Sequence, residues 1–188
     1  MRYYGDPVLR RKAKPVDVIT DDLRALAADM TATMRDAGGI GLAANQVGDL
    51  RRIVLVDVSA GKTPAAFRIV VNPRIVRRTG SHTDEEGCLS LPGLRAPVRR
   101  AMEARIEGLG LDGQPVAIEA AGLEARAFQH EIDHLDGILF TDRLPFIKRI
   151  RMWKELGKIK RRYGSERNRS EQIPAGSGRS GSSGAGPA

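Results

Sequence analysis

Two of the chain's three histidines lie four residues apart, with a glutamate between them. The segment QHEIDH, which begins at Gln129, places His130 and His134 around Glu131. On an α-helix, residues four apart project onto the same face, so the two imidazoles can reach one metal ion. Glu131 is turned by about 100° from His130, so it would lie beside the ion, within reach of a water. The H-E-x-x-H pattern therefore predicts a metal site with Glu131 as its base.

A catalytic site of this kind usually has three protein ligands and one open position, so a third ligand must come from elsewhere. No histidine follows His134, and the next glutamate, Glu155, lies beyond Pro145 on a basic segment. The remaining candidate is the single cysteine, Cys88, in EGCLS. A lone cysteine is ordinarily a small buried apolar residue, but the unfilled position favours Cys88 as the ligand. His82, in GSHTDEEG, lacks such support and is expected to be a solvated loop residue.

The neighbours of Cys88 suit a second task in the same site. Gly87 lets a substrate backbone approach closely, because it has no side chain. Leu89 presents a backbone N–H one residue past the sulfur, where it could face a developing oxyanion.

A glycine-rich segment, GGIGLAANQVG from Gly38 to Gly48, resembles a phosphate loop only superficially. It has no Lys-Ser or Lys-Thr pair and does not match G-x-G-x-x-G, so we expect no nucleotide cofactor. Gln46 could project its uncharged amide into a cleft. A tight helix-to-strand connection with a surface glutamine explains this segment equally well when it is taken alone.

Length and composition favour one soluble domain. The chain of 188 residues is long enough to bury a core, and one cysteine cannot form an internal disulfide. The first residues lack the apolar region of a signal peptide, and no apolar run approaches the roughly 18 residues of a membrane span. We therefore expect a cytoplasmic protein that does not act in a membrane.

The net charge of +8 is concentrated in the C-terminal part. Residues 146–188 hold 11 Lys and Arg against 3 acidic residues, so residues 1–145 balance at 20 against 20. A neutral body with a basic appendage suggests that the appendage, rather than the active site, meets an anionic partner.

The elements that must position these residues follow from hydrophobic periodicity. Helices are predicted from Thr20, as N-cap, to Gly38-Gly39, again from Gly122 to Asp136, and from Phe146 to Gly164. In the last of these, Ile147, Ile150, Trp153, Leu156 and Ile159 are expected to form one apolar stripe. Strands are predicted at 51–58, 67–73 and, as one alternating segment, 98–108.

The order of elements, without regular βα alternation, predicts an α+β fold with antiparallel or mixed sheet. We expect a catalytic domain at 1–164, including the basic C-terminal helix at 146–164. After Gly164 the residues are Ser, Gly, Pro and Arg with almost no apolar content, so 165–188 are expected to be a disordered tail.

Three segments together are similar to one known family. GIGLAANQ (39–46), EGCLS (86–90) and QHEIDH (129–134) resemble the three motifs of the peptide deformylases, in that family's order and spacing. The resemblance covers approximately Val8 to Lys160, and the C-terminal helix places it with the bacterial or organellar form. It implies a small α+β fold around a central metal-binding helix, and removal of the N-formyl group from new chains that begin with formylmethionine.

The resemblance also implies roles for individual residues. Cys88, His130 and His134 would bind a divalent metal, natively Fe²⁺, with Zn²⁺ or Ni²⁺ as substitutes; a thiolate and two imidazoles suit all three ions. Glu131 would move the proton. The Gln46 amide and the Leu89 N–H would hold the oxyanion.

Substrate contacts are implied by the same resemblance. Ile40 and Gly41, with Gly87 opposite, match positions that pair with an extended peptide, and the methionine pocket would be lined by Leu123, Ala127 and Ile40. Glu86 and Asp133 are candidates for orienting ligands, although a solvated helix face explains Asp133 equally well.

Two other functions are compatible with parts of the pattern. A metallopeptidase shares H-E-x-x-H but requires a third ligand other than cysteine. A nucleic-acid or ribosome-binding protein would use the metal structurally and the basic helix functionally. In an enzyme, the same helix could dock on the ribosome near the emerging substrate; packing by its apolar stripe, with solvated charges, is the competing explanation.

Overall fold

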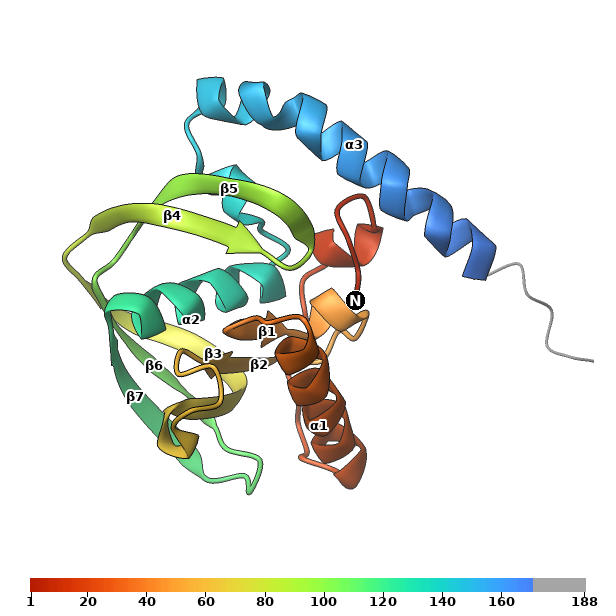
Figure 1. Ribbon diagram of the computed structural model, residues 1–188. Coiled ribbons are helices and arrows are strands. Elements are labelled where there is room, and N and C mark those ends of the chain that lie inside the picture. Colours follow the sequence, from red (N-terminus) through yellow and green to blue (C-terminus); the bar gives the residue numbers. More distant parts are fainter. Residues whose placement is uncertain (171–188) are drawn as a thin grey trace, which may run out of the picture.

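The computed structural model describes residues 1–170, of which residue 65 and residues 164–170 are described through their backbone alone (Figure 1). Helices and strands alternate irregularly along the chain. In order they are η1 (Pro7–Arg10), α1 (Asp21–Asp36), β1 (Gly41–Ala43), η2 (Ala44–Val47), β2 (Ile53–Asp57), η3 (Pro64–Ala66), β3 (Phe67–Thr79), β4 (His82–Cys88), β5 (Leu91–Arg100), β6 (Glu103–Leu109), β7 (Pro115–Ala121), α2 (Gly122–Leu135), η4 (Phe140–Arg143) and α3 (Phe146–Ser170).

Helix α2 lies between two separate sheets. A five-stranded antiparallel sheet, in the order β1-β2-β3-β6-β7, covers one side of the helix, and the β4–β5 hairpin covers the other (Figure 1). Residues Ala125–Leu135 of α2 are all buried as a result. The described strands thus confirm the predicted α+β class with antiparallel sheet around a central helix.

Strand β2 shows why helices can pack on both faces of the five-stranded sheet. Its residues, IVLVD, are all buried, which is typical of a strand that is covered on both faces. Val54 and Val56 pack in the cluster that contains α2, while Ile53 and Leu55 pack in the cluster that contains α1. Because side chains alternate across a strand, this continuous apolar run holds α1 and α2 on opposite faces.

The hairpin has an irregular tip that forms part of the site. Gly87 pairs with Arg95, but the next residue, Cys88, pairs with Leu91, so residues 92–94 bulge out of β5. The tip beyond Cys88 is a tight connection through Leu89 and Ser90. This bulge frees backbone on one side of the hairpin and places Cys88 at its end.

Several local predictions are confirmed. Thr20 caps α1 by accepting a hydrogen bond from the Leu23 N–H, at 3.3 Å, and the helix ends at Asp36, before Gly38. Helix α2 spans nearly the predicted range and stops ahead of Gly137, whose φ is +74°.

The strand predictions are less accurate. The segment 98–108, predicted as one alternating strand, is divided between β5 and β6 by a turn at Ala101 and Met102. Met102 N–H bonds to the Thr79 carbonyl, 3.1 Å away, which fixes this turn through a partner that sequence periodicity does not reveal. Strands β1, β4 and β7 were not predicted, since they are short, polar or rich in alanine.

The single apolar stripe predicted for α3 is wrong. Leu156 and Ile159 are buried, but Ile147, Ile150 and Trp153 are exposed. Positions three apart rotate by about 300° on a helix, so each step drifts by about 60° and five such residues cannot face one surface. The helix also continues to Ser170, past its predicted end at Gly164; the rest of the predicted tail, 171–188, lies outside the described residues.

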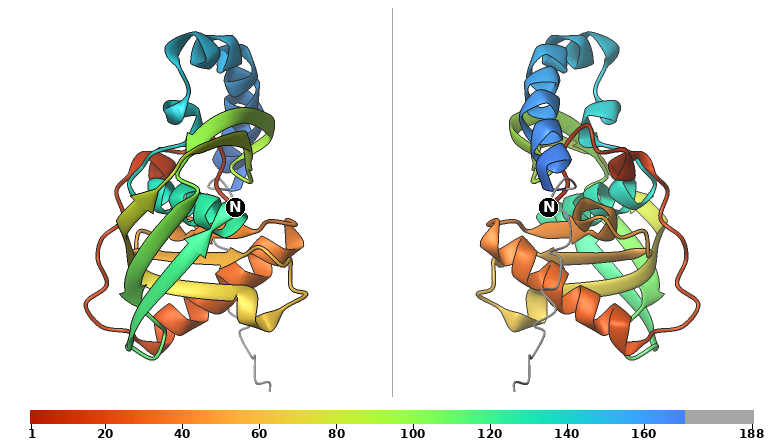
Figure 2. Two further views of the ribbon diagram at one scale, coloured as in Figure 1. Left: turned by 90° about the vertical axis from the view of Figure 1, so that its left-hand side faces the viewer. Right: turned by 90° about the vertical axis from the view of Figure 1, so that its right-hand side faces the viewer.

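Helix α3 stands against the hairpin on the side away from the five-stranded sheet (Figure 2). Its buried residues join a cluster with Leu9 of η1, Phe140 of η4 and the apolar face of β5. No helix among residues 1–170 is long and apolar enough to cross a membrane.

Replacing Leu156 with Ala should lower the free energy of unfolding by roughly 2–5 kcal/mol, because the change leaves a cavity behind β5. Trp153→Ala, on the same helix, should change it by less than about 0.5 kcal/mol, because Trp153 is 59% exposed. Urea unfolding of both variants measures the difference. Equal losses would mean that α3 does not pack as described.

Candidate active site

Three predicted ligand residues meet between α2 and the tip of the hairpin. His130 and His134, one turn apart on α2, have ring centroids 4.9 Å apart. Cys88, at the end of β4, brings its Sγ to 3.1 Å from His134 Nε2. One ligand atom from each of the three residues lies within 4.8 Å of the others. The fold therefore joins residues separated by more than 40 positions in the sequence.

A carboxylate next to Nδ1 fixes the tautomer of His130. Its Nδ1 lies 3.0 Å from Glu86 Oε2, in a buried contact. Because the Glu86 carboxylate accepts hydrogen bonds, Nδ1 carries the proton and leaves the Nε2 lone pair for a ligand. Glu86 thus orients His130, as the sequence suggested it would orient a ligand.

The Glu131 carboxylate is buried and reaches the strand opposite α2. Its Oε2 has no hydrogen-bond partner among the described residues. Its Oε1 lies so close to Gly41 that a side chain at this position would collide with it. Burial raises the pKa of Glu131 to about 7. An unpaired, buried carboxylate beside three candidate ligand atoms offers a free acceptor to a bound water or substrate.

Gln46 points its amide at the thiol. Its Oε1 accepts the Ala43 N–H at 2.8 Å, which leaves Nε2 3.6 Å from Cys88 Sγ and 3.3 Å from Ser90 Oγ. Gln46 is 1% exposed, so it is not the surface glutamine that the sequence allowed. The backbone bond fixes which end of the amide is the donor toward the site.

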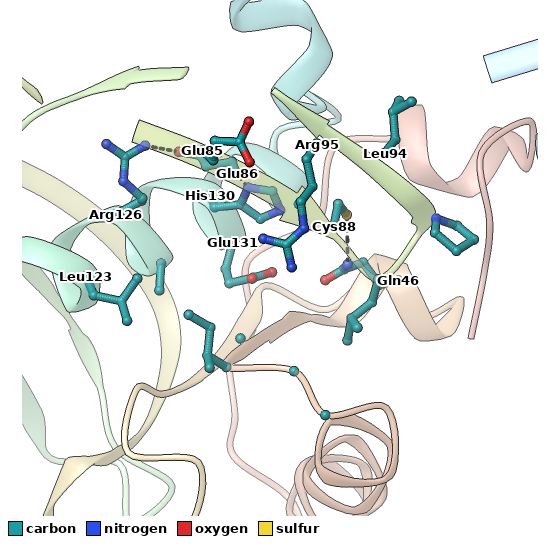
Figure 3. Close-up of a pocket in the computed structure, with 18 of the residues that line it drawn as sticks. Gln46, Glu85, Glu86, Cys88, Leu94, Arg95, Leu123, Arg126, His130 and Glu131 are labelled. Carbon is teal, nitrogen blue, oxygen red and sulfur yellow. Dashed lines mark hydrogen bonds and ion pairs between the residues drawn. The ribbon is translucent and has the colours of Figure 1, made fainter. Parts of the chain in front are cut away.

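A pocket of about 480 Å³ opens onto these side chains and is called the catalytic pocket here. Gln46, Cys88 and Glu131 project toward a shared space in it (Figure 3). The remaining predicted residues that line it are Ile40, Gly41, Glu86, Gly87, Leu89, Leu123, Ala127 and His130. Leu123 is 52% exposed, at the mouth of the pocket.

The donor set fits a divalent transition metal. One sulfur and two imidazole nitrogens converge, the free carboxylate of Glu131 stands beside them, and all four side chains are buried or partly buried. Sulfur and imidazole ligands suit Fe²⁺, Zn²⁺ or Ni²⁺, and three protein ligands leave a position for substrate or water.

Behind the ligands lies a buried network of ionic groups that sequence analysis only partly identified. Glu86 accepts two hydrogen bonds from Arg100, at 2.9 and 3.0 Å, and one from Arg126, at 2.7 Å. Asp133 is also buried; it accepts from Arg100, at 2.5 Å, and twice from Arg143. Asp133 therefore does not belong to a solvated helix face.

These contacts keep Glu86 ionised. Burial by itself raises the pKa of its carboxyl, but hydrogen bonds from His130 and Arg100 and the charge of Arg100 outweigh burial and lower this pKa to about 2. The carboxylate therefore remains an acceptor for the His130 N–H at any ordinary pH.

Arg126 ties the hairpin to α2. Besides Glu86, its guanidinium donates to the carbonyls of Val98, at 3.0 Å, and His82, at 3.1 Å. His82 itself is exposed, as predicted, and contributes only its backbone. Since β4 carries Cys88 and α2 carries the histidines, one side chain connects the two parts of the ligand set.

The sequence held two signals for these arginines. Arg126 lies four residues before His130, on the same helix face. Arg100 follows Leu94, Ala96 and Val98 at every second position, which is the inward side of β5. An arginine at an inward position of an alternating strand implies a buried acidic partner.

Comparison with known proteins identifies the family. The sequence model described as polypeptide deformylase matches residues 1–150. The chain belongs to this family. The peptide deformylase of Alkalilimnicola ehrlichii is 48% identical over 158 residues, which cover 84% of this chain and 88% of that protein. Peptide deformylase 1 of Clostridium perfringens is 46% identical over 142 residues, 76% of this chain and 95% of that protein.

Solved structures agree in fold. The crystal structure of the peptide deformylase from Thermus thermophilus superposes with a TM-score of 0.80 at 44% identity, covering 87% of this chain and 98% of that one. Peptide deformylases are metal-dependent hydrolases that remove the formyl group of N-formylmethionine peptides, and this chain is an enzyme of that kind. The family match decides against a metallopeptidase and against a protein that only binds nucleic acid.

Replacing Arg126 with Ala should weaken metal binding by roughly 10–100-fold, because the hairpin and α2 lose their shared anchor. The measurement is competition for the metal against a chelator, with circular dichroism to check the fold. Arg105→Ala, which removes an exposed guanidinium paired with Glu119, is the control and should bind metal as the wild type does. Unchanged affinity in Arg126→Ala would show that the ligands are held without it.

Proposed function

We propose that deformylation takes place in the catalytic pocket, with Cys88, His130 and His134 holding the divalent metal and Glu131 moving the proton. The observation that carries this proposal is the convergence of the Cys88 sulfur and two imidazoles beside the unpaired Glu131 carboxylate. The bound ion would supply Lewis acidity for the formyl carbonyl and for the attacking water.

Glu131 acts on both sides of the reaction. Its carboxylate projects into the catalytic pocket, where the unpaired Oε2 can accept the proton of the water that attacks the formyl carbon (Figure 3). The same carboxyl then delivers the proton to the nitrogen of the leaving amine, which releases formate and the free peptide N-terminus. Gly41 allows this because it leaves room for the carboxylate against β1.

Gln46 and Leu89 would stabilise the oxyanion that forms on the formyl oxygen. The Gln46 Nε2, held in place by the Ala43 bond to Oε1, is an uncharged donor at the edge of the ligand set. The Leu89 N–H follows directly after Cys88. Removal of one such donor typically costs about 3 kcal/mol in transition-state stabilisation.

The substrate peptide would lie extended between β1 and the tip of the hairpin. Ile40 and Gly41 on one side and Gly87 on the other line the catalytic pocket, and their backbones are suited to pairing with an added strand. Leu123, Ala127 and Ile40 provide apolar surface for the methionine side chain. The bulge at 92–94 keeps the hairpin side of this channel open.

Wild-type enzyme should release formate from a formyl-Met peptide and leave the matching acetyl-Met peptide intact. Glu131→Gln should keep its bound metal and lose roughly 10²–10⁴-fold in turnover, since the proton acceptor is gone. Cys88→Ala should lose both its activity and its bound metal. Formate release and metal content are measured on the same samples. Full activity in Glu131→Gln, or full metal content in Cys88→Ala, would contradict these roles.

We further propose Fe²⁺ as the natural metal. Thiolate and imidazole ligands suit it, and the family resemblance favours it over Zn²⁺ and Ni²⁺. Enzyme reconstituted with Fe²⁺ without oxygen should turn over faster than the same preparation with Zn²⁺; oxygen must be excluded because a thiolate ligand is oxidised easily. The rate of formate release per bound ion is the measurement. A faster zinc enzyme would overturn this assignment.

We also propose that α3 contacts the ribosome in the cytoplasm, where the substrate emerges. The helix keeps Phe146, Ile147, Ile150 and Trp153 exposed, although buried residues on its other face suffice to pack it. Basic residues flank this apolar surface, among them Arg151 and Lys154, which are exposed. Exposed apolar side chains within a basic helix are typical of a binding surface.

The double variant Arg151→Glu, Lys154→Glu should pellet less with ribosomes than the wild type, because repulsion replaces attraction to an anionic partner. Lys12→Glu, Lys62→Glu makes the same change of net charge at exposed positions outside α3 and should pellet normally. Equal pelleting of both double variants would exclude α3 as the contact.

A further inference from the structure

A second pocket, of about 530 Å³, lies on another side of the buried ionic network and shares no lining residue with the catalytic pocket. Its charged lining is nearly all arginine. We call it the arginine pocket and define it by Arg78, Arg99, Arg100, Arg143 and Asp133.

The charged groups at its floor are already paired with one another. Arg100 donates to Glu86 and Asp133, and Arg143 donates to Asp133 through two nitrogens. With Arg126, which also donates to Glu86, three guanidinium groups share these two carboxylates, and both carboxylates are buried. These arginines are already engaged by carboxylates, and the floor has no excess of negative charge that would repel an anion.

The rim carries two guanidinium groups without a carboxylate. Arg99 donates from Nε and Nη2 to the Ser81 hydroxyl, at 3.1 and 2.9 Å, which orients it without neutralising its charge. The Arg78 side chain, among the described residues, has no hydrogen-bond or ion-pair partner, although its backbone pairs with β6. Neighbouring arginines of the five-stranded sheet do pair with carboxylates.

The contrast is clearest along β3 and β6. Arg77 and Arg105 both pair with Glu119, at 2.8 Å each. Arg77 and Arg78 are consecutive in β3, so their side chains leave the strand on opposite faces. On the face of Arg77, glutamates pair with the arginines. On the opposite face, Arg78 lines the arginine pocket without such a partner.

We propose that the arginine pocket binds a phosphate group. Two uncompensated positive charges match a phosphate, which carries about −1.5 to −2 near neutral pH. Its tetrahedral oxygens can accept from several guanidinium forks at once, which is the geometry that arginine recognises best. A carboxylate carries a single negative charge and would balance only one of the two rim arginines. The phosphate is either a terminal monoester of a nucleic acid or a free anion, because both carry about this charge and at least three free oxygens, whereas an internal phosphodiester carries a single charge.

The test compares two double variants that remove equal charge. Arg78→Gln, Arg99→Gln takes both cations from the rim, while Arg77→Gln, Arg105→Gln takes two from the neighbouring face. Inorganic phosphate should raise the melting temperature of the wild type and of the control in a saturable way. The rim variant should bind phosphate at least about tenfold more weakly, which is the effect expected for a lost charge-assisted hydrogen bond. The melting temperature of each variant without phosphate shows whether the variant is folded.

A second arm replaces phosphate with a short single-stranded RNA that carries a 5′-phosphate. If the rim variant also binds RNA more weakly than the control, the phosphate is that of a nucleic acid; if only inorganic phosphate distinguishes the variants, the ligand is a free anion. Either result supports the pocket. Equal binding by both double variants in both arms, or no saturable binding by the wild type, would overturn the proposal.

Discussion

One constraint governs this molecule: a sulfur on a two-stranded hairpin must meet two imidazoles on a helix, although the hairpin is hydrogen-bonded to no other strand among the described residues. Hydrogen bonds from side chains, in place of hydrogen bonds to a neighbouring strand, therefore hold the hairpin in position. Arg126 donates to the hairpin carbonyls, and Gln129 pairs through its amide with both backbone groups of Ala101, at 3.0 and 3.1 Å. Apolar packing by α3 and η4 covers the outer side of the hairpin. The position of Cys88 is thus an outcome of tertiary contacts.

The buried charges have a positional role more than a stabilising one. Burying an arginine or a carboxylate is unfavourable unless each is paired, and a satisfied pair contributes little net stability. Here Arg100, Arg126 and Arg143 are shared between Glu86 and Asp133, and the remaining acceptor capacity of Glu86 is directed at His130. The same network separates the catalytic pocket from the arginine pocket. A rigid ionic layer of this kind can support different surfaces on its two sides.

Local signals in the sequence predicted the helices and a candidate chemistry for the site. H-E-x-x-H, the cysteine in EGCLS and the glutamine in GIGLAANQ indicated the ligand residues, the base and an amide donor, because residue type and helical spacing limit what such groups can do. The cap at Thr20 and the stop before Gly137 are likewise set by neighbours in sequence. The resemblance of three ordered motifs to the peptide deformylases then indicated the fold and the reaction, and the family match confirms both.

Tertiary structure decided what the sequence left open. It divided 98–108 into two strands, turned Ile147, Ile150 and Trp153 of α3 to solvent, and buried Asp133 with two arginines. It also brought the amide of Gln46 to the thiol of Cys88 and recruited Arg126 to join helix and hairpin. Periodicity reports which side of an element is apolar, because that depends on neighbours three or four positions away. It does not report which distant element will cover that side, because pairing between segments depends on the packing of the whole chain.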